Sequence, residues 1–93
     1  MTPEDRFIEA FTFHANKDYG TAIERLNSLL IDHPDMHMAW GLRGAVLHDL
    51  KHPFDAIMNY DRASSIAPEV ASYYNNRGAC KLDLSLYNSA TAR

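Results

Sequence analysis

The sequence predicts an all-α fold in which short helical hairpins stack into an α–α superhelix. The first observation is a repeat, because a shift of 34 residues places Ala22 on Ala56 and Pro34 on Pro68, and a period of this length is typical of a helical solenoid. The second is that apolar residues recur at helical spacing within each period. The third is that no alternating, strand-like pattern competes with them. Stacked hairpins would bury these apolar stripes against one another.

Each period contains two expected helices, and each helix has one apolar stripe. The stripes of the first helices are Phe7, Ala10, Phe11 and His14, then Trp40, Gly44 and Leu47, then Tyr74, Gly78 and Leu82. The stripes of the second helices are Ala22, Ile23, Leu26, Leu29 and Leu30, then Ala56, Ile57, Tyr60 and Ala63. Because only a few residues connect one helix to the next, neighbouring helices must run antiparallel.

Capping signals mark the starts of the early helices. Thr2 can cap the first helix, with Pro3 at its first position and Asp5 reaching back to complete a capping box. Asp35 is similarly placed just before the helix that contains Trp40. These signals predict where the first helix of each of the first two repeats begins.

The later helices have comparable signals. Pro53 can open the second helix of the second repeat, and Ser85 can cap the second helix of a shortened third repeat. Gly44 and Gly78 lie in the interior of first helices, where a glycine costs about 1 kcal/mol relative to alanine. We expect two helices to approach closely at each of these glycines, which would offset that cost.

Composition and charge exclude several classes of function. With 93 residues, of which 46% are hydrophobic and 23% charged, the chain can form one small folded domain. A net charge of -3 with scattered Lys and Arg argues against nucleic acid as the primary partner. The acidic start and the lack of a long apolar run predict neither a signal peptide nor a membrane span. A single cysteine, Cys80, favours a reducing, cytoplasmic setting.

Two histidine pairs have a spacing that could hold a metal on a continuous helix. They are His33 with His37 and His48 with His52. Pro34 interrupts the first pair, His52 falls at a helix end, and neither pair has an obvious third ligand. We therefore expect solvated histidines and no metal site.

Other residues that could carry chemistry have simpler interpretations. Cys80 lies between Ala79 and Lys81 on an expected helix, where packing is the usual role of a cysteine. The glycines stand apart, so no phosphate-binding loop is present. Arg43 and Arg77 recur one period apart, and we expect their stems to lie across the helix interface. The sequence thus predicts no catalytic residues and no cofactor, so the protein is not expected to be an enzyme.

Tryptophan or tyrosine, glycine, alanine and proline recur at set offsets along the chain. The positions are Ala10, Ala22, Pro34, Trp40, Gly44, Ala56, Tyr60, Ala63, Pro68, Tyr74, Gly78, Tyr87 and Ala90. This pattern resembles the tetratricopeptide-repeat (TPR) family. The resemblance implies one domain over residues 1–93, with about two and a half helix-turn-helix repeats at residues 3–36, 37–70 and 71–93. Either the third repeat has a shortened end, or the chain is a fragment of a longer array.

The resemblance also implies a function. First helices of TPR arrays line a concave groove that binds peptides or partner helices. By this resemblance the groove residues are Phe7, Ile8, Phe11, His14, Met38, Leu42, Ala45, His48, Asp49, Asn75, Asn76, Ala79, Leu82 and Asp83. This surface would be apolar with an acidic rim, so we expect an apolar protein or peptide segment as partner. Ile8 and Leu42 could equally well belong to the core.

One known mode of TPR binding is not expected here. Family members that hold the carboxylate end of heat-shock chaperone tails use Lys, Arg and Asn in the groove. Here apolar residues such as Phe7 and Leu42 stand there instead, and only Asn75 and Asn76 resemble that clamp. The leading interpretation is a non-catalytic interaction scaffold. The alternative is a regulatory segment of a longer TPR-containing enzyme or chaperone complex.

The C-terminal end suggests a second mode of association. Leu82, Leu84, Leu86 and Tyr87 lie near the terminus with no following repeat to cover them. Arrays of repeats normally end on a polar surface, so these residues predict a homodimer formed through the C-terminal end.

Overall fold

Five helices follow one another in the computed structural model, which describes residues 1–91 and the side chains of residues 1–86. They are α1 (Pro3–Ala15), α2 (Tyr19–Asp32), α3 (His37–Asp49), α4 (Pro53–Ile66) and α5 (Ala71–Thr91). Within that part of the chain there is no strand, so the all-α prediction is confirmed. No helix in it is long and apolar enough to cross a membrane.

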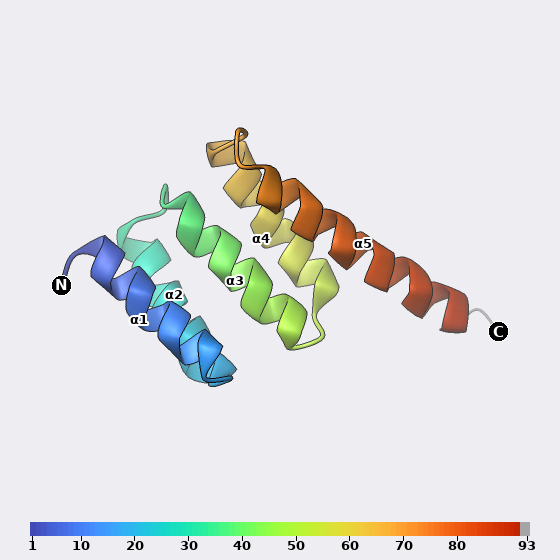
Figure 1. Cartoon of the computed structure of the whole chain (residues 1–93), viewed down its shortest axis with the longest axis horizontal. Coiled ribbons are helices and arrows are strands. Elements are labelled where there is room, and N and C mark those ends of the chain that lie inside the picture. Colours follow the sequence, from blue (N-terminus) through green and yellow to red (C-terminus); the bar gives the residue numbers. More distant parts are fainter. Residues whose placement is uncertain (92–93) are drawn as a thin grey trace.

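The helices form two antiparallel hairpins followed by a single long helix. Figure 1 shows α1, α3 and α5 side by side on one face, with α2 and α4 behind them. The molecule is elongated, with principal dimensions of 50 × 29 × 19 Å. This is the stacked arrangement that the repeat predicts.

The start of α1 follows its sequence signals, whereas the start of α3 does not. Asp5 donates its backbone N–H to Thr2 Oγ1 at 3.1 Å, and Thr2 donates its own to Asp5 Oδ2 at 3.3 Å, so the predicted capping box is present. Pro3 occupies the first helical turn as expected. Asp35 was expected to cap α3, but Met36 is the N-cap and makes no side-chain hydrogen bond there. The Asp35 prediction is therefore wrong, because α3 begins one residue later than that cap requires.

The two hairpin turns have the same backbone structure. Lys17 and Lys51, one period apart, adopt left-handed conformations with φ of 62° and 67°. Each donates its N–H to a carbonyl at the end of the preceding helix, at 2.9 Å to His14 and 3.0 Å to His48. A left-handed non-glycine residue costs roughly 1 kcal/mol, which these hydrogen bonds to helix-end carbonyls offset. Pro53 then opens α4, as predicted.

The third repeat does not form a hairpin. α5 continues without a break from Ala71 to Thr91, so Ser85 lies inside a helix and does not cap one, and this prediction is wrong. The reason is local, because Ser85 is flanked by Leu84 and Leu86, both strong helix formers, with no proline nearby. The side chains of Tyr87 and Ala90, which belong to the repeat pattern, lie outside the described residues.

The core consists of two clusters that share one residue. The first cluster lies among α1, α2 and α3, with Leu26, Leu29 and Val46 fully buried. The second lies among α3, α4 and α5 and contains Cys80. Trp40 packs against both clusters. Burial of each large side chain contributes roughly 1.5–3 kcal/mol, so successive hairpins stabilise one another through α3.

Glycines allow two close helix contacts on α3. A Cβ at Gly44 would lie 3.1 Å from the ring of Tyr60, so the predicted close approach at this glycine is confirmed. Gly78 was expected to make the same contact, but a Cβ there would meet no atom within 4 Å, and the prediction is wrong. Gly78 is exposed, so it lies on a face of α5 that no other described helix contacts. Sequence analysis missed a tighter contact, in which Gly41 faces the ring of Tyr73.

Candidate functional site

Large apolar side chains are exposed on the three helices that share one side of the molecule. Ile8 and Phe11 on α1, Met38 on α3 and Leu82 on α5 are 59%, 52%, 47% and 61% exposed. We call the solvent-facing side of α1, α3 and α5 the first-helix face. Its apolar residues come from helices that are far apart in sequence and adjacent in space.

The expected groove residues divide by burial into three groups. Exposed residues are Ile8, Phe11, Met38, Asp49, Asn75, Asn76, Ala79, Leu82 and Asp83. Half-buried residues are Phe7, His14, Ala45 and His48, and Leu42 is buried. Ile8 and Leu42 could each have belonged to the groove or to the core. Ile8 lies at the surface, whereas Leu42 belongs to the first core cluster. The prediction that Leu42 lines the groove is therefore wrong.

Aromatic rings form a row along α1 that connects the core to the first-helix face. The ring centroids of Phe7 and Phe11 are 6.5 Å apart, and those of Phe11 and His14 are also 6.5 Å apart, with an edge-to-face geometry in the second pair. Phe7 packs against the core cluster, and Phe11 is half exposed. Contacts of this kind add about 0.5–1.5 kcal/mol to the burial itself, so the row holds Phe11 in place.

Two histidine–aspartate pairs connect neighbouring first helices. His14 Nε2 lies 2.7 Å from Asp49 Oδ2 between α1 and α3, and His48 Nε2 lies 2.5 Å from Asp83 Oδ2 between α3 and α5. The two pairs are one period apart, so the repeat reproduces the contact. Sequence analysis placed these residues in the groove but did not pair them. The signal was their recurrence, because both the histidine and the aspartate return after 34 residues.

The histidine pairs considered earlier as metal ligands do not lie together on one helix. Pro34 and Asp35 separate His33 from α3, and His52 is the N-cap of α4. His37 Nδ1 instead lies 2.8 Å from the hydroxyl of Tyr73. Among the described residues, no three His, Cys, Asp or Glu side chains are arranged to hold a metal ion.

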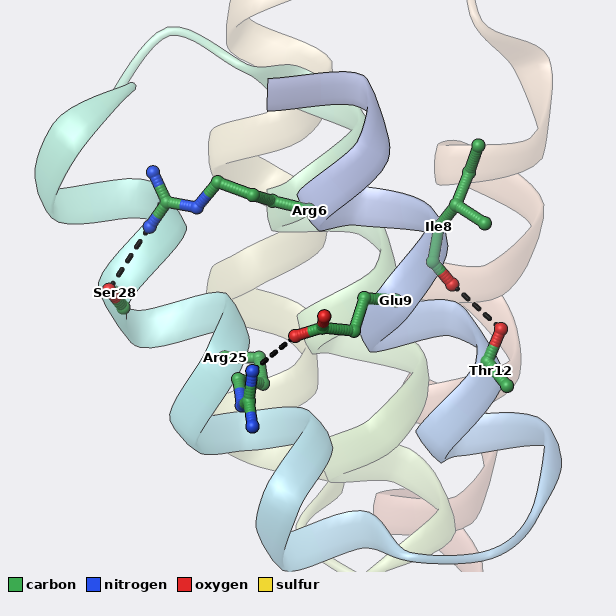
Figure 2. Close-up of polar contacts among 6 residues, drawn as sticks. All are labelled: Arg6, Ile8, Glu9, Thr12, Arg25 and Ser28. Carbon is green, nitrogen blue, oxygen red and sulfur yellow. Dashed lines mark hydrogen bonds and ion pairs between the residues drawn. The ribbon is translucent and has the colours of Figure 1, made fainter. Parts of the chain in front are cut away.

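Polar side chains fasten α1 to α2 at the edge of the first-helix face, as Figure 2 shows. Arg6 donates to Asp32 at 2.8 Å and to Ser28 at 3.1 Å, and Arg25 forms an ion pair with Glu9. Each exposed pair contributes up to about 1 kcal/mol. These two pairs join α1 to α2 in the first hairpin.

Buried groups in the second core cluster hold their protons tightly. Burial, followed by the charges of Cys80 and Asp49, raises the pKa of Tyr60 to about 12. Burial and the charge of Asp83 raise the pKa of the Cys80 thiol. A thiol that is fully buried and resists ionisation is a poor nucleophile. Cys80 therefore has the packing role that the sequence predicts.

The C-terminal part of α5 carries further exposed apolar residues. Leu82 and Leu86 are exposed, and Leu84 is half-buried. A hollow of about 510 Å³ lies beside them, between α5 and the turn that joins α3 to α4. The residues that line it are His48, Lys51, Pro53, Asp83, Leu84 and Leu86. The side chain of Tyr87, the fourth residue expected in this surface, lies outside the described residues.

Comparison with known proteins identifies structures with a similar fold and a distant relative in sequence. No family model matches the chain. Protein FlbA from Caulobacter vibrioides is 31% identical over 71 residues, which is 76% of this chain. The chain spans only 12% of the length of that relative.

Two solved structures are similar to the arrangement of helices in this chain. The TPR2AB domain of yeast Sti1, in a complex with pHSP90, superposes on 95% of this chain with a TM-score of 0.85 and 19% identity, and the chain spans 34% of that structure. A tetratricopeptide repeat domain protein from Salinibacter ruber superposes on 87% of this chain with a TM-score of 0.70 and 20% identity, and 93% of that structure is covered. The chain therefore has the tetratricopeptide-repeat fold.

Proposed function

We propose that this chain is a non-catalytic protein–protein interaction module that binds a peptide or a partner helix on the first-helix face. The observation that carries the proposal is the exposure of Ile8, Phe11, Met38 and Leu82 on three adjacent helices. Exposed apolar side chains gathered on one side of a small domain are typical of binding surfaces. The fold adds support, because the Sti1 domain that shares it is in a complex with pHSP90.

The ligand that this face fits best is an apolar segment with basic residues. Asp49 and Asp83 are 46% and 51% exposed in their side chains, and each accepts a hydrogen bond from one histidine. A carboxylate can accept several hydrogen bonds, so both can also bind a Lys or Arg of the ligand. Apolar side chains of an amphipathic helix would cover Phe11 and Leu82, with cations at the acidic edge.

A ligand that ends in the carboxylate tail of a heat-shock chaperone is not proposed for this chain. A clamp for two carboxylates needs cationic and amide donors, whereas Phe7 and Ala45 occupy clamp positions here. Asn75 and Asn76 are exposed and offer only a partial equivalent. We expect peptides that end in EEVD to bind weakly or not at all.

A peptide selection followed by titration tests the proposal. Peptides selected on the protein should be enriched in apolar and basic residues, and a fluorescein-labelled example should bind about 5- to 20-fold more weakly to Phe11→Ala. Phe54→Ala is the matched control, because Phe54 is exposed on α4, away from the first-helix face. Equal effects of the two substitutions would refute the proposal. Micromolar binding of an EEVD-type peptide, abolished by substitution of Asn76, would refute the expected ligand class.

Self-association through the C-terminal end is a second candidate function. The observation that favours it is the exposure of Leu82 and Leu86 beside the hollow near Pro53. Sedimentation at high micromolar concentration should detect a dimer that Leu86→Glu disrupts. Ile31→Glu is the control, because Ile31 is more exposed than Leu86 and lies on α2. A strictly monomeric protein at these concentrations excludes this function.

The alternative role is that of a regulatory segment of a longer TPR-containing enzyme or chaperone complex. We treat residues 1–93 as one domain, with repeats at 3–36, 37–70 and 71–93. The unpaired, buried Cys80 supports a cytoplasmic setting. Cell fractionation of the tagged native protein tests the location.

A further inference from the structure

A hollow of about 540 Å³ lies between α3 and α4. Its lining residues are Trp40, Arg43 and Leu47 from α3 and Asp55, Met58, Asn59 and Arg62 from α4. We call it the Trp40 hollow. None of these residues belongs to the expected groove, so the hollow is separate from the first-helix face. Its volume falls within the range of pockets that hold small ligands and peptide side chains.

Two guanidinium groups lie near the same indole ring in this hollow. The Cζ atoms of Arg43 and Arg62 are each 5.8 Å from the centroid of the Trp40 ring. Contact with the indole face orients each guanidinium, and the planar N–H groups of a guanidinium match a planar anion. Two cationic side chains therefore line the same hollow, beside one indole ring.

These two arginines differ from the other three in the described part of the chain. Arg6, Arg25 and Arg77 each form an ion pair, for example Arg77 Nε with Asp61 Oδ1 at 2.6 Å. No described carboxylate pairs with Arg43 or Arg62 within 4 Å. The repeat explains the difference for Arg43, which is equivalent to Arg77. The position equivalent to Asp61 is Asn27, which has no charge.

A buried amide with an unused acceptor lines the same hollow. Asn59 is only 7% exposed, and its Nδ2 donates to the backbone oxygen of Asp55 at 2.8 Å. That bond fixes which way the amide faces. Its Oδ1 is buried and has no described partner, and the Nε of Arg43 is in the same state. Buried polar atoms are almost always hydrogen-bonded, so these two atoms in the lining of the hollow are exceptions.

We propose that the Trp40 hollow is a second binding site, which takes an acidic segment of a partner protein. A glutamate or aspartate side chain of the segment binds between the guanidinium groups of Arg43 and Arg62. The two arginines outweigh the single carboxylate that lines the hollow, on Asp55. Leu47 and Met58 offer apolar contact to the neighbouring residues, which a free inorganic anion would not use.

Trp40 provides a direct probe, because it is the only tryptophan in the chain. The ligand for the test is a capped pentapeptide, acetyl-Ala-Leu-Glu-Leu-Ala-amide, and the control has glutamine in place of glutamate. The glutamate peptide should change the Trp40 fluorescence in a saturable way, with Kd on the order of 100 µM. The glutamine peptide should bind at least roughly 10-fold more weakly, since charge-assisted bonds to arginine are the strong ones.

A pair of arginine variants locates the effect. Arg62→Gln should weaken binding of the glutamate peptide by about 5- to 10-fold, and its fold is retained because Arg62 is exposed. Arg25→Gln is the control, since Arg25 is also exposed but pairs with Glu9. Binding to Arg25→Gln should equal that to the parent protein, and circular dichroism checks that both variants remain folded.

Three results would overturn the proposal. One is equal binding of the glutamate and glutamine peptides, and another is equal affinity of Arg62→Gln and the parent protein. The third is that inorganic phosphate alone competes as strongly as the peptide, which would make the hollow a site for small anions. None of these depends on the first-helix face, so the two binding proposals can fail separately.

Discussion

The two hairpins α1–α2 and α3–α4 contrast with α5, although all three repeats begin in the same way. α1 ends at Ala15 and α3 at Asp49, one period later. By the same period a third turn would follow Asp83, but α5 continues to Thr91. Lys17 and Lys51 take left-handed conformations, whereas Ser85, at the equivalent position, stays helical.

The residues that follow these positions account for the contrast. After the first turn, Asp18 accepts a hydrogen bond from the backbone of Thr21 at 3.4 Å and caps α2. After the second, Pro53 starts α4. Leu86, at the position equivalent to Asp18, cannot cap a helix. A repeat period therefore predicts where a turn can form, and local capping chemistry decides whether it does.

The largest difference between the two regions should appear in their leucines. Leu26 is fully buried in α2, so Leu26→Ala should lower the free energy of unfolding by about 2–5 kcal/mol. Leu82 on α5 is mostly exposed, and Leu82→Ala should change the free energy of unfolding by no more than about 0.5 kcal/mol. Urea unfolding followed by circular dichroism measures both values. Similar losses in the two variants would mean that α5 is as tightly packed as the hairpins.

Replacement of a glycine by alanine should change the stability in opposite directions in the two regions. Gly41→Ala introduces a Cβ against the ring of Tyr73, and we expect a loss of about 1–3 kcal/mol. Gly78→Ala meets no neighbouring atom, so it should stabilise α5 by about 0.5–1 kcal/mol through helix propensity.

Thermal unfolding of the single variants checks the signs of these effects. A double variant with Tyr73→Leu checks the contact, because the smaller side chain should reduce the cost of Gly41→Ala. Destabilisation by Gly78→Ala would show that α5 has a close neighbour at that position after all.

Alkaline pH should weaken the junction between the hairpins and α5, where Tyr60 is buried. The unfolded chain loses a tyrosine proton near pH 10, while the folded protein keeps that of Tyr60 up to about 12. The contribution of Tyr60 to the free energy of unfolding is thus fully present below pH 10. It falls as the pH rises toward 12, by an amount of order 2 kcal/mol.

The matched variant for this effect is Tyr60→Phe. It should unfold like the parent protein at pH 7 and lose less stability between pH 9 and 11.5, as measured by urea unfolding at each pH. The raised pKa values of Tyr73 and Cys80 act in the same direction, so part of the alkaline loss should remain in the variant. Identical pH profiles for the two proteins would contradict the burial of the Tyr60 hydroxyl.

Much of the fold could be predicted because its signals are local or periodic. The capping box of Thr2 and Asp5 needs only residues three apart, and the apolar stripes need only helical spacing. The prediction for Gly78 was wrong because a sequence period implies that each repeat has the same neighbours, which does not hold for the last helix. The same assumption placed a helix start at Ser85.

The first-helix face was harder to predict, because burial on a helix that contacts two neighbours depends on how the helices cross. Ile8 and Leu42 are both aliphatic residues on first helices, yet only Leu42 is buried. The pairing of His14 with Asp49 joins residues that are 35 apart on separate helices. No pattern within one helix could identify it, although its recurrence one period later could have.

The smallest effect on stability should come from Ser85→Pro, which tests whether the end of α5 contributes to the packed domain. Proline inside a helix removes one hydrogen bond and clashes with the preceding turn, at a cost of about 3 kcal/mol where the helix is packed. We expect that cost from Ser64→Pro, because Ser64 lies inside the packed helix α4, in its last turn.

Ser85→Pro should instead leave the unfolding midpoint nearly unchanged, since the exposed Leu82 and Leu86 show how little of this part of α5 is buried. Circular dichroism should still record a loss of helix equivalent to the segment after Ser85, because proline can end the helix there without disturbing the hairpins. A drop in the midpoint comparable to that of Ser64→Pro would mean that the C-terminal part of α5 is held by contacts as strong as those within the hairpins. The hairpins and α5 would then differ only in whether the chain turns back, and not in how firmly each is packed.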